Sequence, residues 1–310
     1  MNYRTHQSLA LAVLSSITTA LFLASCASGP AVPAGGHVDF SNYDKPLTDQ
    51  ITDHIKAKVT ARLGEGKNVR DRYFIIPFAY ENKGNDPAFS HSFLSVIRVF
   101  ADGSQPTVSA GLKKRTYKGR EFEAFTISWL PHDFPENPHL CVFKGIGAAL
   151  VPSMNQCPVS PGKSFDLPTT LQLAVHEQGA VAMWGPYEIS KPGFDLGVKR
   201  LRLLETGTIK YRADDRGYRK RKEAINCFHA MAGLDELFPD GGFLDTGFKM
   251  WGLNGTKQVL REYTTKASNK HLLLEPVDIE SDIIGFVYVP DRTEKGVYDP
   301  FTTSASAYHK

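Results

Sequence analysis

The feature that most constrains the fold is a series of β-type segments between residues 73 and 189. They are rich in β-branched and aromatic residues, and Gly, Pro, Asn and Asp separate them, which is typical of strands joined by turns. The predicted strands are Tyr73–Tyr80, Phe93–Phe100, Phe122–Leu130, Leu167–Val175 and Ala180–Ile189, followed later by Leu272–Ile279 and Ile283–Val289.

Helical patterns lie mainly before and after this series. An apolar residue recurs every four positions between Leu47 and Leu63, which predicts an amphipathic helix that starts near Pro46 and ends at Gly64. Further helices are predicted at 194–205, 227–238 and 256–263. Because helices and strands are segregated along the chain, we expect an α+β fold with an antiparallel β-sheet packed against a few helices.

The N-terminus predicts export and lipid attachment. Arg4 precedes the apolar stretch Leu9–Ala24, which is too short for a comfortable membrane span. The run Leu23-Ala24-Ser25-Cys26 then resembles the signal of bacterial lipoproteins, in which Cys26 carries the lipid; an ordinary cleaved signal peptide is the alternative. Because Ala27 rather than Asp follows, we expect an outer-membrane lipoprotein that faces the periplasm and contacts the membrane through its lipid.

The chain is therefore divided into four parts. We expect a signal peptide at 1–25, a flexible tether rich in Gly, Pro, Ala and Ser at 26–43, a single α+β domain at 44–295 and a disordered tail at 296–310. Without the signal peptide, 35 basic residues stand against 33 acidic ones. This balance gives no reason to expect a nucleic-acid partner.

The other three cysteines have separate expected roles. Cys141 and Cys157 lie 16 residues apart in a segment rich in Pro and Gly, and an oxidising periplasm favours a disulfide between them. Cys227 is left over, and such a thiol is either reactive or a small buried apolar residue. Asn226 is a favoured N-cap, and the positive end of a helix dipole would stabilise the Cys227 thiolate.

A nucleophilic thiol needs a base within hydrogen-bonding reach. His229 lies two positions further along the predicted helix and would point away from the thiol. His91 is the better candidate, because it stands at the start of a predicted strand, after a polar loop. A histidine in that position can reach into a cleft while its strand stays in the core.

The group that orients the base is expected at the end of the next long strand. His132 and Asp133 both stand there, and the choice between them stays open. If the two strands form an antiparallel hairpin with its midpoint at Gly111-Leu112, His91 and His132 become neighbours.

The order of these segments resembles that of the circularly permuted papain-like proteins, which include relatives of the NlpC/P60 proteins and of lecithin:retinol acyltransferase. The matching segments are Ser90–Phe93, Thr126–His132 and Ile225–Ala230. The resemblance covers roughly residues 73–265. It implies a permuted papain-like fold, with Cys227 as nucleophile, His91 as base and His132 as the third polar group.

The resemblance implies acyl chemistry without a cofactor. The expected function is an envelope-anchored thiol hydrolase or acyltransferase that acts on an amide or ester bond, in a cell-wall peptide or a lipid. The alternative is a non-catalytic lipoprotein, a binding or assembly module in which Cys227 is buried and inert. The sequence contains neither HExxH nor GxSxG, so it indicates no zinc peptidase and no serine hydrolase. We expect no metal site.

Overall fold

The computed structural model describes residues 45–81, 91–104, 107–109, 111–136, 157–176, 180–213, 224–231, 256 and 283–286. The expected signal peptide, tether and tail lie outside these residues, as do Cys26, Cys141 and the predicted strand at 272–279. The same holds for most of the helices predicted at 227–238 and 256–263. No helix in the described residues is long and apolar enough to span a membrane.

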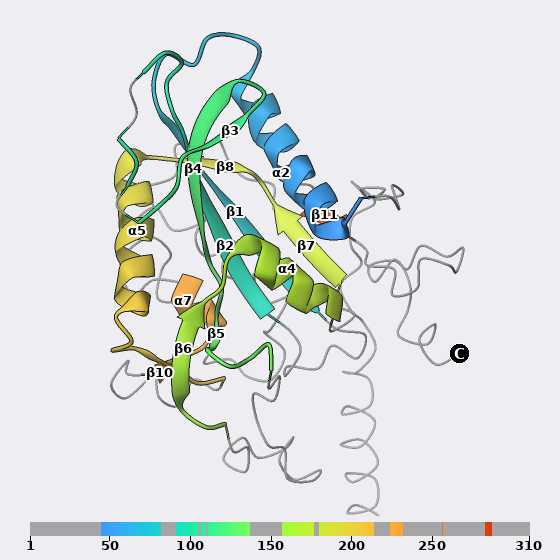
Figure 1. Ribbon diagram of the computed structural model, residues 1–310, viewed down its shortest axis with the longest axis vertical. Coiled ribbons are helices and arrows are strands. Elements are labelled where there is room, and N and C mark those ends of the chain that lie inside the picture. Colours follow the sequence, from blue (N-terminus) through green and yellow to red (C-terminus); the bar gives the residue numbers. More distant parts are fainter. Residues whose placement is uncertain are drawn as a thin grey trace, which may run out of the picture.

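The centre of the structure is a seven-stranded sheet with the order β11-β7-β1-β2-β4-β3, in which β8 also pairs with β1 (Figure 1). Every described pair in this sheet is antiparallel. The strands are β1 (Arg72–Glu81), β2 (His91–Val99), β3 (Arg115–Tyr117), β4 (Arg120–Ile127), β7 (Ala180–Trp184), β8 (Tyr187–Ile189) and β11 (Ile283–Phe286). The predicted α+β class with an antiparallel sheet is therefore confirmed.

A smaller sheet lies at the lower end of the molecule in Figure 1 and has the order β10-β9-β6-β5. Its strands are β5 (Trp129–Pro131), β6 (Ser160–Ser164), β9 (Lys210–Tyr211) and β10 (Ala224–Ile225). Only one residue, Ser128, separates β4 from β5. The chain therefore passes from the large sheet to the small one at Ser128.

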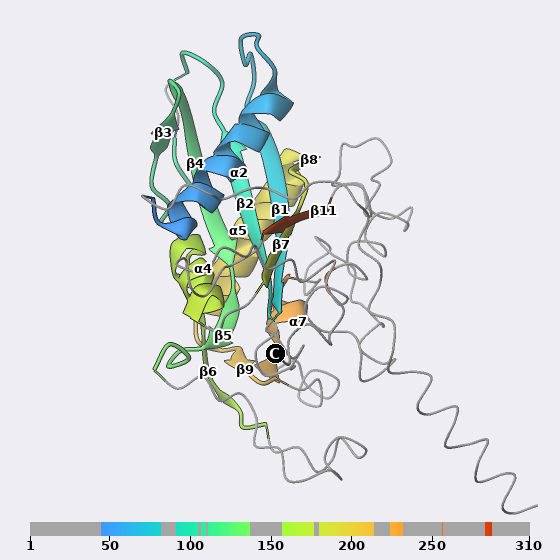
Figure 2. The same ribbon diagram turned by 90° about the vertical axis from the view of Figure 1, so that its right-hand side faces the viewer.

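Helices cover both faces of the large sheet. Helices α2 (Leu47–Leu63) and α4 (Leu167–His176) pack on one face, and α5 (Lys191–Glu205) and α7 (Cys227–Met231) pack on the other. Figure 2 shows α4 and α7 on opposite sides of the strands. Because side chains alternate along a strand, each strand supplies both cores: Phe74 faces α2 and α4, whereas Ile75 faces α5 and α7.

The predicted strand at Leu167–Val175 is wrong, because this segment forms the helix α4. The carboxylate of Asp166 accepts a hydrogen bond from the Thr169 amide at 2.9 Å, which caps the first turn. Leu171 and Ala174 then fall on one helical face, and both are fully buried. The β-branched residues of the segment favoured a strand, but the cap and the helical spacing decide the structure.

Most other elements confirm the predictions. Helix α2 has the predicted bounds and buries Ile51, Ile55 and Val59. Helix α5 begins at Lys191, three residues before its predicted start, and its N-cap Ser190 accepts from the Gly193 amide at 3.3 Å. The predicted strand at 180–189 is divided into β7 and β8 by the turn at 185–186.

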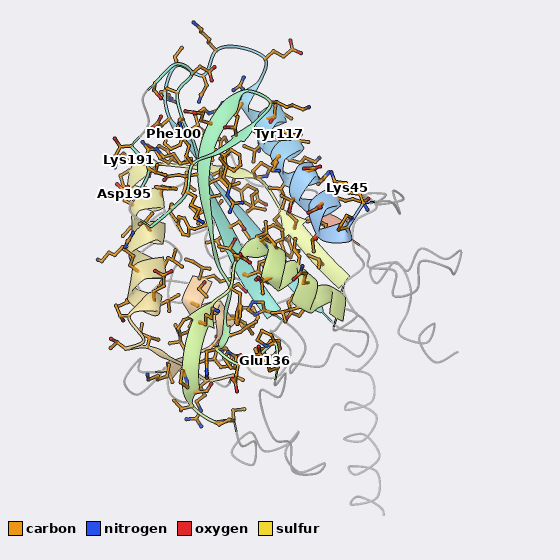
Figure 3. All side chains as sticks on the ribbon, viewed as in Figure 1. Lys45, Phe100, Tyr117, Glu136, Lys191 and Asp195 are labelled. Carbon is orange, nitrogen blue, oxygen red and sulfur yellow. The ribbon has the colours of Figure 1, made fainter. Side chains whose placement is uncertain are left out.

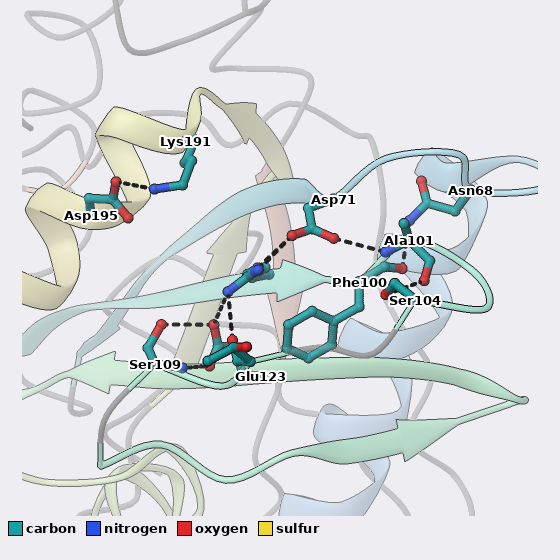
Figure 4. Close-up of polar contacts among 11 residues, drawn as sticks. Asn68, Asp71, Phe100, Ala101, Ser104, Ser109, Glu123, Lys191 and Asp195 are labelled. Carbon is teal, nitrogen blue, oxygen red and sulfur yellow. Dashed lines mark hydrogen bonds and ion pairs between the residues drawn. The ribbon is translucent and has the colours of Figure 1, made fainter.

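A buried polar network fixes one end of β2 (Figure 4). The guanidinium group of Arg98 donates to Asp71 at 2.6 Å and to Glu123 at 3.1 Å. Glu123 is fully buried and also accepts from the backbone amide of Ser109 at 2.7 Å. Asp71 accepts from the Ala101 amide at 2.9 Å. These bonds satisfy a buried carboxylate and tie two loops to β2 and β4, so we assign the network a structural role.

Candidate functional site

Cys227 opens helix α7, as the sequence predicts, and Asn226 is its N-cap. The Asn226 side-chain oxygen accepts a hydrogen bond from the His229 amide at 3.1 Å. The thiol is buried, with 7% of the residue exposed. Burial raises its pKa to about 11, which outweighs the opposing effect of the Ser92, Cys227 and Phe228 backbone amides close to the sulfur. At neutral pH the thiol is therefore protonated and is not the thiolate that the helix position suggested.

His91 begins strand β2, as predicted, but its ring is buried in the core. Only 1% of the residue is exposed. The ring stacks on Phe93, with centroids 5.6 Å apart, and meets Tyr80 at 5.4 Å. Its Nε2 atom lies 2.9 Å from the hydroxyl oxygen of Ser128. Burial lowers the pKa of His91 to about 3, so the imidazole is neutral at every physiological pH.

A chain of hydrogen bonds links His91 to helix α4. The Thr170 hydroxyl lies 2.8 Å from Ser128 Oγ and 2.8 Å from the carbonyl oxygen of Asp166. The Thr170 hydroxyl is the donor in both of these contacts, and the proton between Ser128 Oγ and His91 Nε2 can belong to either residue. The other ring nitrogen of His91, Nδ1, is buried and has no hydrogen-bond partner within the described residues.

Burial argues against Ser128 as a nucleophile activated by His91. Their 2.9 Å contact has the length expected of a serine–histidine pair. However, burial lowers the pKa of His91 to about 3, so the imidazole is a weak base for the Ser128 proton. Both residues are also buried from any substrate, with Ser128 fully inaccessible.

The structure does not bring Cys227 and His91 together. His91 contacts Phe93 and Tyr80, which belong to the core on the α2 and α4 face. Cys227 belongs to the core on the opposite face, beside α5. The thiol reaches β2 at the backbone amide of Ser92, one residue beyond His91. Consecutive side chains of a strand point to opposite faces, so His91 points away from the thiol.

His132 is also separate from His91. The predicted hairpin would place Trp129 opposite Leu94, whereas the structure places Ile127 there, a difference of two residues in register. The chain has left the large sheet before it reaches His132, whose side chain is 57% exposed with Nδ1 3.7 Å from Asp133 Oδ1. The partner of His91 is Ser128, which the sequence analysis did not select. The sequence feature that could have identified Ser128 is its position as a small hydroxyl residue between the apolar residues Ile127 and Trp129.

Cys157 is buried and disulfide-bonded, and its partner lies outside the described residues. The pairing with Cys141 therefore stays a prediction. Within the described ranges, no group of three or more His, Cys, Asp or Glu residues could hold a metal ion.

An open groove with a cavity volume of about 130 Å³ lies on the α2 and α4 face of the large sheet. It runs between α2 and the strands β2, β4 and β3, and the start of α4 closes one end. Apolar residues form most of its lining: Ile55, Val59 and Leu63 from α2, Ile97 and Val99 from β2, Phe122 and Ala124 from β4, and Leu167 and Pro168 from α4. Ligand sites commonly have an apolar lining of this kind with a few polar groups at one place.

Basic residues gather at the β3 end of the groove. Lys56, Arg115 and Arg120 line it there. Tyr117 of β3 also lines the groove and lies beside α2 (Figure 3). The Lys56 ammonium lies 5.3 Å from the centroid of the Tyr117 ring. Arg120 Nη2 donates to two carbonyl oxygens of the loop after α2, at 3.2 and 3.0 Å. This arrangement holds the Arg120 guanidinium group in place at the mouth of the groove.

Comparisons with protein-family models, with curated proteins and with solved structures found no significant match for this chain. The resemblance to the permuted papain-like proteins consequently stays a hypothesis that depends on the quoted segments. Any conclusion about function therefore depends on the geometry of the described residues.

Proposed function

We propose that this protein is an envelope-anchored lipoprotein that acts as a non-catalytic binding module. Its ligand surface is the groove between α2 and β4, and Cys227 is a buried core residue. One observation carries the proposal: the thiol and its expected base, His91, lie on opposite faces of the sheet.

The protonation states support the same conclusion. A cysteine enzyme needs a thiolate, usually formed by proton transfer to a nearby histidine. Here the pKa of the Cys227 thiol is about 11 and the pKa of His91 is about 3. Both pKa values therefore disfavour transfer of a proton from the thiol to the imidazole. The ground state of the protein is therefore far from an active thiolate–imidazolium pair.

The competing function is a thiol hydrolase or acyltransferase of cell-wall peptides or lipids. Its support is the position of Cys227 at a capped helix start. It would require His91 to turn to the α7 face, which means a one-residue slip of β2. Such a slip would also turn Phe93 and Ile97 out of the core that they share with α2. The cost of exposing these side chains disfavours this arrangement.

Alkylation of the folded protein with iodoacetamide across a pH series tests the proposal. Cys227 should stay unmodified in the native protein up to strongly alkaline pH and should react fully once urea unfolds the chain. The Cys227→Ala variant supplies the background from the other cysteines. Rapid labelling of native Cys227 below pH 8.5, the ordinary pKa of a cysteine thiol, would instead support the thiol enzyme. Mass spectrometry of the same membrane-extracted sample should show diacylglycerol on Cys26.

A further inference from the structure

We infer that the groove between α2 and β4 binds a single-chain phospholipid, with the acyl chain along the apolar floor and the phosphate at the basic β3 end. This inference rests on the proposed function and specifies its ligand.

The floor of the groove suits a hydrocarbon chain better than a peptide. It is the face of a hydrogen-bonded sheet, in which β2 and β4 pair continuously from Leu94 to Val99. The hydroxyl groups of Ser95 and Thr126, which line the groove, bond to each other at 2.9 Å. The floor therefore offers few free donors or acceptors. A bound peptide would leave its own backbone groups without partners there, whereas an acyl chain needs none.

The charge at the two ends gives the ligand a direction. Lys56, Arg115 and Arg120 line the β3 end, and Asp166 lies at the α4 end, where it caps the helix. An anionic head group is thus attracted to the β3 end and repelled from the α4 end. Asp53 forms ion pairs with both Lys45 and Lys56. Its single negative charge therefore neutralises the charge of Lys56 only in part.

The donors at the β3 end match a phosphate. Arg115 is exposed and makes no ion pair within the described part of the chain. Nη1 of Arg120 is buried without a hydrogen-bond partner among the described residues, while Nη2 is held by backbone carbonyls. Guanidinium groups bind phosphate oxygens through paired N–H donors. A phosphodiester carries one negative charge, as a carboxylate does, but its tetrahedral oxygens can accept from donors of several residues at once, so a phosphate head group fits these three cations better than a fatty acid.

Binding of lysophosphatidylglycerol to the full folded chain in detergent-free buffer, below the critical micelle concentration, tests the inference by calorimetry. We expect saturable binding of one lipid, with affinity rising about fourfold for each added methylene until the floor is filled. Monoacylglycerol and palmitate of equal chain length should bind at least tenfold more weakly. Inorganic phosphate alone should not compete at millimolar concentration.

Two variants separate the head-group end from the floor. Arg115→Glu changes an exposed residue and should weaken lysophosphatidylglycerol binding about tenfold, with no effect on the melting temperature. Lys113→Glu, an equally exposed basic residue that does not line the groove, is the matched control and should bind as the parent does. Ala124→Phe should block the floor and abolish binding.

Equal binding of monoacylglycerol and lysophosphatidylglycerol, or no effect of Arg115→Glu, would overturn the assignment of the phosphate. Absence of lipid binding would overturn the inference altogether and would indicate a different occupant, such as another protein chain. Neither result affects the thiol-labelling test. Conversely, a reactive Cys227 would refute the non-catalytic function even if the lipid binds.

Discussion

His91 should make the protein less stable as the pH falls below about 6.5. Burial lowers the pKa of this histidine from 6.5 to about 3 in the folded chain. Between these values the unfolded state binds a proton that the folded state does not, so the free energy of unfolding decreases as the pH falls. The stabilisation is fully present above pH 6.5 and is lost progressively toward pH 3.

The expected size follows from the linkage relation. Within this window one histidine contributes about 1.4 kcal/mol per pH unit. Between pH 7 and pH 5 the free energy of unfolding should therefore fall by about 2 kcal/mol because of His91 alone. Urea titrations followed by tryptophan fluorescence at several pH values measure this slope, since Trp129 and Trp184 are fully buried.

The His91→Gln variant isolates the contribution of this residue. The glutamine amide can still form a hydrogen bond with Ser128 but does not titrate. Between pH 7 and pH 5, the free energy of unfolding of this variant should therefore change less steeply than that of the parent, by about 1 kcal/mol per pH unit. His132→Gln is the control, because His132 is exposed. Burial also lowers the pKa of His54, which adds to the slope in every variant and cancels in the comparison. Identical slopes for the parent and His91→Gln would refute the buried neutral histidine.

Two further changes test the packing. Glu123→Ala should cost about 2 to 4 kcal/mol in urea unfolding, because it removes a fully buried carboxylate to which Arg98 and Ser109 donate. Glu121→Ala breaks only a largely exposed pair and should cost under about 1 kcal/mol. Equal losses would refute the structural network. Gly162→Ala would place a Cβ atom 2.0 Å from the Trp129 ring and should cost about 1 to 3 kcal/mol, while Gly66→Ala, with no atom within 4 Å, should be nearly neutral.

The sequence predicts the large sheet well because its elements have simple periodic patterns. Helix α2 follows its four-residue repeat, and β2 and β4 pair antiparallel as expected. The register was wrong by two residues because the connection is not a simple turn: β3 and a loop anchored by Ser109 lie between the strands. The loop is held by hydrogen bonds from Ser109 to Glu123, 14 positions further along the chain. A local sequence pattern does not reveal contacts of this kind.

The candidate site was predicted less well, for a different physical reason. Alternation along β2 shows that His91 shares a face with Phe93, but it does not show which helix covers that face. That assignment depends on how α2, α4, α5 and α7 are distributed over the two sides of the sheet. Cys227 begins a helix as predicted, but its thiol meets β2 at the Ser92 amide, whereas the His91 ring packs on Phe93.

The buried residues and the groove differ in how visible they are in the sequence. Cysteine and histidine can perform chemistry, but both also fill apolar cores, and burial then moves each pKa away from the value that catalysis requires. A lipid groove has no comparable signature, because Ile97, Val99 and Ala124 are common strand residues, and Arg115 and Arg120 resemble any exposed basic residue. Only the folded sheet places the apolar floor next to the basic end, so a surface of this kind becomes visible in the structure and stays hidden in the sequence.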